Sequence, residues 1–212
     1  MEPILHFIDF ILHLDHHLTA IIDQNVLLAY SLLFLIIFCE TGLVFTPFLP
    51  GDSLLFVVGT IAATETLKIG VVAPFLIAAA ILGDSMNYYI GHLLAPRVFR
   101  DEHIRFLRKD HLKRTEKFFE KYGAKTIIIA RFIPIIRTFA PFLAGIGSMK
   151  YPKFLLYNVT GGVLWVGLCI FSGYFFGNLP FVKKHFSLVV LAIIIISIIP
   201  AVVEVILHHK DE

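Results

Sequence analysis

The sequence predicts an all-α integral membrane protein, built as an inverted repeat with two re-entrant broken hairpins and about three full spanning helices. The first observation is composition: 58% of the 212 residues are apolar and 16% are charged, whereas soluble domains carry about 25% charged residues. The second is that prolines and ionisable residues interrupt two apolar regions. The third is a glycine spacing that recurs in the two halves of the chain. Amphipathic interfacial helices complete the predicted fold.

Three apolar segments are long enough to span a bilayer, which takes about 20 helical residues. They are residues 71–94, 154–177 and 186–207. The N-terminal segment, residues 1–25, mixes Ile, Leu and Phe with acids and histidines, which is typical of an amphipathic helix in the membrane interface. It lacks a basic n-region and a small-residue cleavage site, so no removable signal peptide is expected.

The first interrupted region, residues 26–64, has two arms that are both too short to span the membrane. The first arm, 26–39, holds 14 residues and the second, 53–63, holds 11. Proline and glycine between them do not continue a helix. We therefore predict a hairpin that enters the membrane and returns. Its breaks are predicted at Pro47, Pro50 and Gly51.

The second interrupted region, residues 124–149, repeats this pattern with short apolar arms. Its breaks are predicted at Pro134 and Pro141. Non-helical backbone survives at membrane depth only where protein or a water-filled cavity covers it. Both hairpins are therefore predicted to line a cavity.

The two hairpins head two similar halves, residues 26–96 and 124–207. A spacing of 32 positions occurs in both, from Gly59 to Gly91 and from Gly145 to Gly177. Each pair frames the second arm of a hairpin and the spanning helix after it. Interrupted segments at corresponding positions of two halves are typical of the binding site of a transporter.

The basic residues predict the orientation of the chain. Residues 92–125 hold ten of the 18 Lys and Arg residues and five acids. The positive-inside rule places the segment 97–123, predicted to be a basic amphipathic helix, in the cytoplasm. A dedicated anionic-lipid site on this segment is the weaker reading. The C-terminus is then also cytoplasmic, the hairpins enter from opposite faces, and the side of the N-terminal helix stays open.

Four ionisable residues lie on the predicted hairpins. They are Glu40, Asp52, Arg131 and Arg137. A charge at the bilayer centre costs about 2.5–3.5 kcal/mol, so we expect the two acids of one hairpin to pair with the two arginines of the other. Simpler readings are an N-cap role for Asp52, which Ser53 would fill equally well, and snorkelling of Arg131. Secondary candidates are Asp84, Tyr88 and Asn158.

Four stretches of the chain resemble the DedA family of bacterial membrane proteins. They are ETGLVFTPFLPGDSLL at 40–55, GDSMNYYIGH at 83–92, KYGAKTIIIARFIPIIRTFAPFLAGIGSM at 121–149 and YNVTGGVLWV at 157–166. The resemblance runs from about residue 8 to residue 207, and the combination of E-x-G…P-G-D with R-F-x-P-x-x-R-T makes it specific. One departure is His92, where many members carry Arg, which puts a peripheral contact in question.

The resemblance implies a multi-pass transporter or flippase of the bacterial inner membrane that supports envelope integrity, with a domain shared by eukaryotic lipid scramblases. It implies an anionic lipid, undecaprenyl phosphate or a phospholipid, as the partner, and coupling to the proton-motive force. It further implies proton coupling through Glu40 and Asp52, and lipid-phosphate binding by Arg131 and Arg137. No enzyme activity, catalytic residue, metal, cofactor or nucleic-acid partner is expected. The shared motifs leave the lipid and the oligomeric state open.

Elementary chemistry points the same way. Arginine binds phosphate through two parallel hydrogen bonds, and a carboxylate in a low-dielectric cleft binds a proton more readily than in water. The alternative is a proton- or ion-coupled carrier of a small solute, which uses the same broken helices. A membrane lipid phosphatase is set aside because the patterns P-S-G-H and S-R-x-x-x-x-x-H do not occur. A structural or assembly role is the last alternative.

Overall fold

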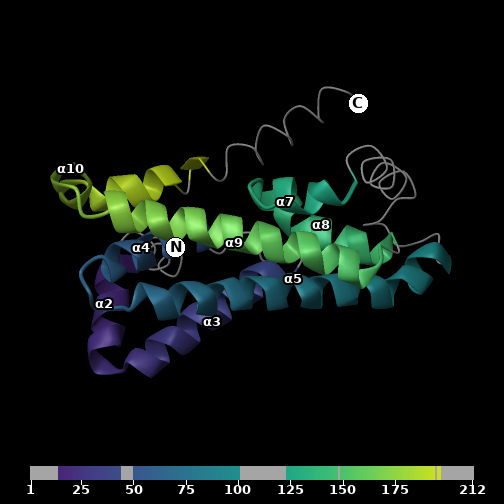
Figure 1. Ribbon diagram of the computed structural model, residues 1–212, viewed down its shortest axis with the longest axis horizontal. Helices are drawn as coiled ribbons and strands as arrows, with labels where there is room; N and C mark the ends of the chain where they lie inside the picture. The colour runs from purple at the N-terminus through teal and green to yellow at the C-terminus, as the bar shows by residue number, and fades with distance from the viewer. Residues whose placement is uncertain (1–13, 44–49, 101–122, 148, 194, 197–212) are drawn as a thin grey trace, which may run out of the picture. The chain divides into compact units, whose positions relative to one another are not determined.

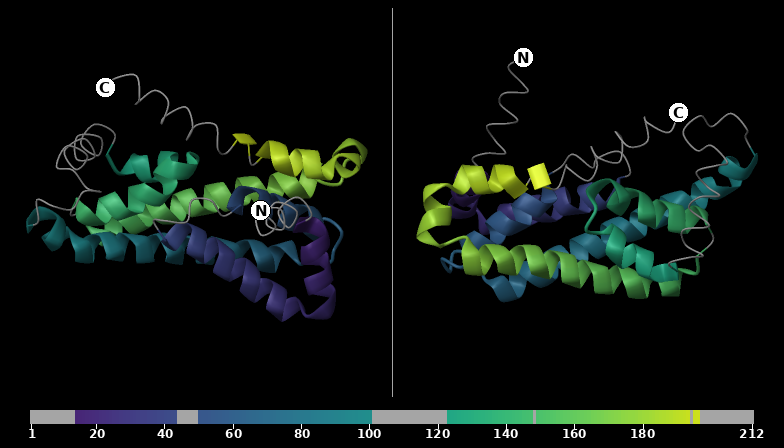
Figure 2. Two further views of the ribbon diagram at one scale, coloured as in Figure 1. Left: turned by 180° about the vertical axis from the view of Figure 1, so that it is seen from behind. Right: turned by 90° about the horizontal axis from the view of Figure 1, so that it is seen from above.

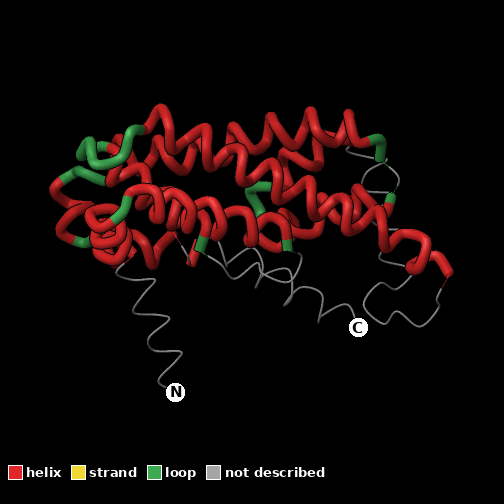
Figure 3. Tube along the Cα trace, turned by 90° about the horizontal axis from the view of Figure 1, so that it is seen from below, coloured by secondary structure: helices red, strands yellow, loops and turns green. Residues whose placement is uncertain are grey.

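The computed structural model describes residues 14–43, 50–100, 123–147, 149–193 and 195–196, and every regular element in these ranges is a helix (Figure 1). Figure 3 shows the same by colour. The predicted all-α class is therefore confirmed. The elements are α2 (Leu14–Gln24), α3 (Val26–Gly42), α4 (Gly51–Ala62), α5 (Ile69–Arg100), the 3₁₀ turn η1 (Gly123–Lys125), α7 (Thr126–Ala130), α8 (Pro134–Ile146), α9 (Tyr151–Phe176) and α10 (Pro180–Lys184).

The two longest helices have the length and apolar composition of membrane spans. These stretches are Ile69–Ala95 of α5 and Tyr151–Phe176 of α9, which match two of the three predicted spans. The third predicted span, 186–207, is helical over 186–193, and its residues from 197 onward lie outside the described part of the chain. Helix α5 continues to Arg100, so the first residues of the predicted basic segment 97–123 extend this long helix.

The two arms predicted for the first hairpin correspond to two helices, α3 and α4. Helix α3 begins after Asn25, whose Oδ1 accepts hydrogen bonds from the backbone N–H groups of Leu27 (3.0 Å) and Leu28 (3.2 Å), the contacts of an N-cap. It ends at Gly42, three residues beyond the predicted arm, and therefore includes Glu40. The connection at 44–49, with Pro47, lies outside the described residues.

The start of α4 excludes the N-cap reading of Asp52. Pro50 occupies the N-cap position, Gly51 is the first helical residue, and Asp52 lies in the first turn. Ser53 donates its hydroxyl to the carbonyl of Pro50 at 3.0 Å. A carboxylate in the first turn of a helix is favoured by the helix dipole.

The second hairpin consists of α7 and α8, which pack against each other across a turn at residues 131–133 (Figure 2). Gly123, at the start of η1, has φ +62°, a left-handed conformation that glycine adopts without steric cost. Pro134 is the first residue of α8, where its fixed φ suits a helix and its missing N–H is not needed. The predicted break at Pro134 is therefore present.

The predicted break at Pro141 is wrong, because Pro141 lies inside α8. A proline within a helix removes one backbone hydrogen bond, and neighbouring helices in membrane proteins supply donors to the freed carbonyl groups. The carbonyl that Pro141 frees belongs to Arg137, four residues earlier. The next carbonyl, that of Thr138, accepts a hydrogen bond from Nδ2 of Asn87 on α5 at 2.7 Å. Helix α8 thus continues through Pro141 and is tied to α5 in the turn before it.

The chain divides into two compact units, and the first contains a close crossing of α4 with the end of α9. This unit comprises Met1–Ile37, Phe48–Ile77 and Val166–Glu212. A Cβ on Gly59 would collide with the carbonyl of Ile170, and a Cβ on Gly173 would collide with the carbonyl of Phe56. Glycine at both positions therefore allows the two backbones to meet.

The second unit, Phe38–Pro47 and Ala78–Trp165, contains the same arrangement between α8 and α5. A Cβ on Gly145 would collide with the carbonyl of Tyr88, and one on Gly91 would collide with the carbonyl of Phe142. In both units each glycine meets the carbonyl of the residue three positions before the opposing glycine. The short helix of each half thus crosses the long helix of the other half.

The register of this repeat differs from the predicted one. The residue that corresponds to Gly91 by its contacts is Gly173, one turn before Gly177. Gly177 instead packs on the side chain of Thr60, whose Oγ1 donates to the carbonyl of Gly173 at 3.3 Å. The spacing of 32 positions matched two glycines with different roles.

We expect Gly145→Ala to destabilise the protein by about 1–3 kcal/mol, because the added methyl forces α8 away from α5. The thermal midpoint of the purified protein in detergent measures this. Gly167→Ala on α9 is the matched control, since a Cβ there meets nothing within 4 Å and alanine favours a helix over glycine. Equal midpoints for the two variants would contradict the crossing.

Candidate functional site

A buried ion pair joins α8 to the last turn of α3. Arg137 Nη2 donates to Glu40 Oε1 at 2.5 Å, and the two residues are 4% and 0% exposed. The restart of the helix at Pro134 places Arg137 one turn inside α8. Two charges withdrawn from water are stable only when they face each other with good geometry. The pair therefore depends on how both broken helices are placed.

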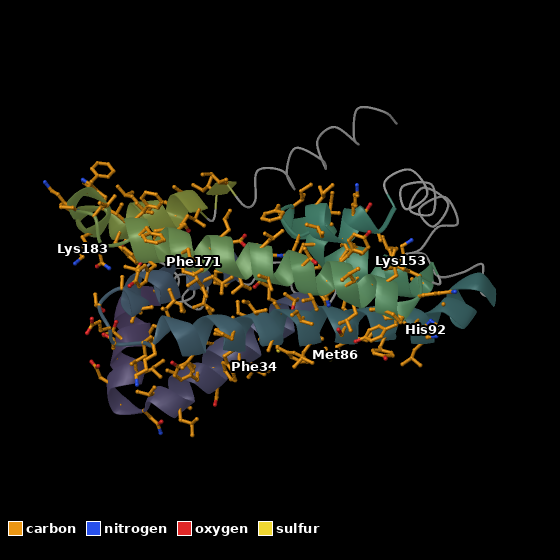
Figure 4. All side chains as sticks on the ribbon, in the orientation of Figure 1. Phe34, Met86, His92, Lys153, Phe171 and Lys183 are labelled. Carbon is orange, nitrogen blue, oxygen red and sulfur yellow. The ribbon has the colours of Figure 1, made fainter. Side chains whose placement is uncertain are left out.

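The end of α3 reaches this position because it lies close to α5. A Cβ on Gly42 would lie 3.2 Å from Cα of Gly83 and 2.9 Å from Cε of Met86. A Cβ on Gly83 would collide with Oγ1 of Thr41. Met86 is labelled on α5 in Figure 4. Two facing glycines thus bring the backbone that carries Glu40 against the spanning helix.

A second buried ion pair fixes Arg131, the residue that follows α7. Its Nη2 donates to Oδ2 of Asp84 on α5 and, at 2.6 Å, to Oδ1 of Asn158 on α9. Asn158 Nδ2 in turn donates to the carbonyl of Ile81 at 3.1 Å, so the amide is oriented by α5. Arg131 is 3% exposed. Two separate helices, α5 and α9, therefore hold one guanidinium group.

The backbone of α9 is shaped to accept this arginine. A Cβ on Gly161 would lie 3.4 Å from Cδ and Nε of Arg131, and one on Gly162 would lie 3.1 Å from its Nη1. Because neither residue has a side chain, the guanidinium of Arg131 lies close to the backbone of α9. Nε and Nη1 of Arg131 have no hydrogen-bond acceptor among the described residues. These two nitrogen atoms could therefore donate to a further acceptor.

One tryptophan contacts both arginines. The Trp165 ring lies 4.8 Å from Cζ of Arg137 and 5.8 Å from Cζ of Arg131, and the side chain is 2% exposed. The face of an indole ring attracts a cation, most strongly where water is excluded. Trp165 therefore brings two positive groups to one surface, while Glu40 and Asp84 balance their charge.

The predicted pairing of two hairpin acids with two hairpin arginines differs from the structure in one partner. Glu40 does face Arg137, but the carboxylate on Arg131 belongs to Asp84, a secondary candidate on a spanning helix. Asp52 lies in α4, in the first compact unit. A long helix that passes the turn at 131–133 supplies an acid that the hairpin pattern does not reveal.

The other secondary candidate, Tyr88, belongs to an aromatic cluster on the same face of α5. Its hydroxyl donates to the carbonyl of Met149, and its ring stacks on Phe154 at 4.6 Å and near Tyr151 at 5.5 Å. His92 is exposed and stacks on Tyr88 at 6.3 Å, and Figure 4 shows it toward the end of α5. This cluster packs α9 on α5, and these contacts of Tyr88 do not include either ion pair.

Sequence reasoning missed two residues of the site, Trp165 and Asn87. Asn87 is fully buried, and its Nδ2 donates to the carbonyls of Thr41 at 3.2 Å and Thr138 at 2.7 Å. A polar side chain within a spanning helix is the signal that would have identified Asn87. Trp165 carries no such signal, since tryptophan is ordinary in an apolar helix. Among the described residues no cluster of His, Cys, Asp or Glu has the make-up of a metal site.

Comparison with known proteins identifies the family. The family model for the VTT domain matches residues 49–175. Protein DedA of Escherichia coli strain K12 is 49% identical over 212 residues, which cover 99% of this chain and 97% of that protein. The chain belongs to the DedA family.

More distant members of the DedA family are also named as membrane proteins. The uncharacterized membrane protein Rv0364 of Mycobacterium tuberculosis is 47% identical over 171 residues, 80% of this chain and 75% of that protein. The inner membrane protein YghB of Escherichia coli is 30% identical over 185 residues, 87% of this chain and 84% of that protein. No solved structure matches the chain. The protein is thus a DedA-family membrane protein.

We expect each single variant of the first pair, Arg137→Met or Glu40→Gln, to lose about 3–5 kcal/mol of stability, because each leaves one buried charge without its counter-charge. The double variant should lose much less than the sum, since both charges are gone. Thermal midpoints in detergent measure the coupling. Lys153→Met, at an exposed lysine of α9 (Figure 4), should change the midpoint little. Additive losses would show that the two groups do not act as a pair.

Proposed function

We propose that this protein moves an anionic lipid, undecaprenyl phosphate or a phospholipid, across the inner membrane and uses the proton-motive force to do so. The observation that carries the proposal is the pair of buried guanidinium groups, Arg131 and Arg137, on one indole ring. Arginine is the residue best suited to grip a phosphate through two parallel hydrogen bonds. The lipid tails would stay in the bilayer while the head group crosses.

The charge balance explains how a proton enters the cycle. Without lipid, Glu40 neutralises Arg137. A phosphate monoanion that takes the place of this carboxylate adds one negative charge to a buried site, which is costly. Uptake of one proton by the displaced Glu40 restores neutrality, because a nearby anion favours the protonated acid. One proton would then accompany each head group.

The other predicted roles enter the proposal by the family resemblance. Asp52, in the first turn of α4 beside the break of the first hairpin, is proposed as a second proton carrier. Both hairpins are proposed to be re-entrant and to open toward opposite faces, with residues 97–123 and the C-terminus in the cytoplasm. The inner membrane is the location named for a relative, YghB. Such a transporter supports the integrity of the cell envelope.

We expect the purified protein in liposomes to accelerate the crossing of a phosphate-bearing lipid, measured with undecaprenyl phosphate and with a glycerophospholipid. Arg137→Lys should reduce the rate at least tenfold while the protein still inserts, because an ammonium group lacks the planar fork. Lys153→Arg, at an exposed position, is the matched control. Full activity of Arg137→Lys would show that only the positive charge is needed at this position, and not the planar guanidinium.

A pH gradient across the same liposomes separates coupled transport from passive exchange. An imposed gradient should bias the direction of crossing, and Asp52→Asn should remove the bias if Asp52 carries the proton, since an amide does not titrate in this range. Lipid crossing no faster than in empty liposomes, together with gradient-driven uptake of a soluble ion or amine, would favour the small-solute carrier. Equal acceleration of all lipids without a response to pH would indicate a scramblase.

A further inference from the structure

The amide of Asn87 contacts both broken helices at the residues that follow the Glu40–Arg137 pair. Its Nδ2 donates to the carbonyl of Thr41 at 3.2 Å and to that of Thr138 at 2.7 Å. Thr41 follows Glu40 in the last turn of α3, and Thr138 follows Arg137 in α8. All these residues belong to the second compact unit. One nitrogen atom thus ties together the two backbones that carry the ion pair.

These two carbonyls are suited to an outside donor. Carbonyl groups in the last turn of a helix have no donor within that helix, which is the position of Thr41 in α3. A backbone carbonyl oxygen has two lone pairs, so the carbonyl of Thr138, inside α8, can accept a side-chain donor as well as a backbone N–H. The end of α3 and the second lone pair at Thr138 both offer acceptors to the amide of Asn87.

Asparagine fits this position for a chemical reason. Its side-chain nitrogen carries two N–H groups, so a single short side chain donates to two carbonyls at once. An aspartate of the same size has no donor when ionised, and a leucine has none at all. Asn87, Thr41 and Thr138 are 0%, 1% and 0% exposed, so water does not replace a lost bond without rearrangement.

The geometry points to Asn87 as a positioning residue that sets the register of Glu40 against Arg137 for phosphate binding. Asp84, one turn earlier on α5, holds Arg131 directly, whereas Asn87 holds Arg137 through the backbone of both partners. Helix α5 therefore orients both arginines of the site. The inference deepens the proposed function and rests on it where lipid movement is concerned, but the geometry of the pair is testable without any lipid.

The first test uses the single tryptophan of the chain. Trp165 lies 4.8 Å from Cζ of Arg137, so its emission reports on the position of that guanidinium. Arg137→Leu, measured in detergent, defines the emission when the contact is lost. Asn87→Leu should shift the emission in the same direction. Asn178→Leu is the matched control, because Asn178 Nδ2 also donates to a threonine carbonyl, that of Thr60 at 3.1 Å, but in the first compact unit.

The second test uses lipid crossing in liposomes. Asn87→Leu should lower the rate at least tenfold, and Asn178→Leu should lower it much less. If Asn87 acts through the ion pair, adding Asn87→Leu to Glu40→Gln should cause little further loss, less than twofold. A purely structural role would instead give multiplicative losses. These arms also separate the two proposals, since a shifted emission without any lipid crossing would support the positioning role and refute lipid transport.

A smaller change covers the case in which leucine prevents folding. Asn87→Ser is smaller than the native residue, so it fits without a clash, and it keeps one donor; its emission and crossing rate should lie between those of the wild type and of Arg137→Leu. The inference is overturned if Asn87→Leu, or Asn87→Ser where leucine does not fold, leaves both the Trp165 emission and the crossing rate unchanged. Multiplicative losses with Glu40→Gln would overturn it as well.

Discussion

The second compact unit has to stabilise two buried guanidinium groups, and most of its polar contacts do so. Arg131 and Arg137 are 3% and 4% exposed in a chain that is 58% apolar, and a charge so placed is stable only with a counter-charge and hydrogen bonds. Glu40 and Asp84 supply the charges, and Trp165 supplies a π face to both arginines. In the proposed function these two arginines bind an anionic head group, the class of ligand that their charge would select.

The glycine crossings explain how such a site is held without long loops. Each short helix, α4 or α8, meets the long helix of the other half, α9 or α5, through a reciprocal pair of glycines. Backbones in contact leave little freedom to slide, so the point at which a hairpin turns is fixed against a long helix. In the second unit this places the end of α3, the turn before α8 and the middle of α5 together. The two glycine crossings thus fix the short helices α4 and α8 against the long helices.

The sequence was sufficient for the helical class, for two long apolar helices, for the turn between α7 and α8 and for the pair Glu40–Arg137, because apolar runs, prolines and isolated charges are visible in a single chain. It was insufficient where the outcome depends on which helices touch. Asp84 replaces a hairpin acid on Arg131, α8 continues through Pro141, and Gly173 takes the role assigned to Gly177. Contacts between distant segments decide the first and the last of these points, and residue spacing does not encode them.

The central claim is that a lipid phosphate takes the place of Glu40 on Arg137, beside the single tryptophan. The most direct measurement is the emission of Trp165 in detergent during titration with a short-chain phosphatidic acid, compared with the diacylglycerol of the same chains. The account predicts a saturable change with the phosphatidic acid, no change with the diacylglycerol, and loss of the response in Arg137→Lys. An equal response to both lipids, or none to the phosphatidic acid, would contradict it.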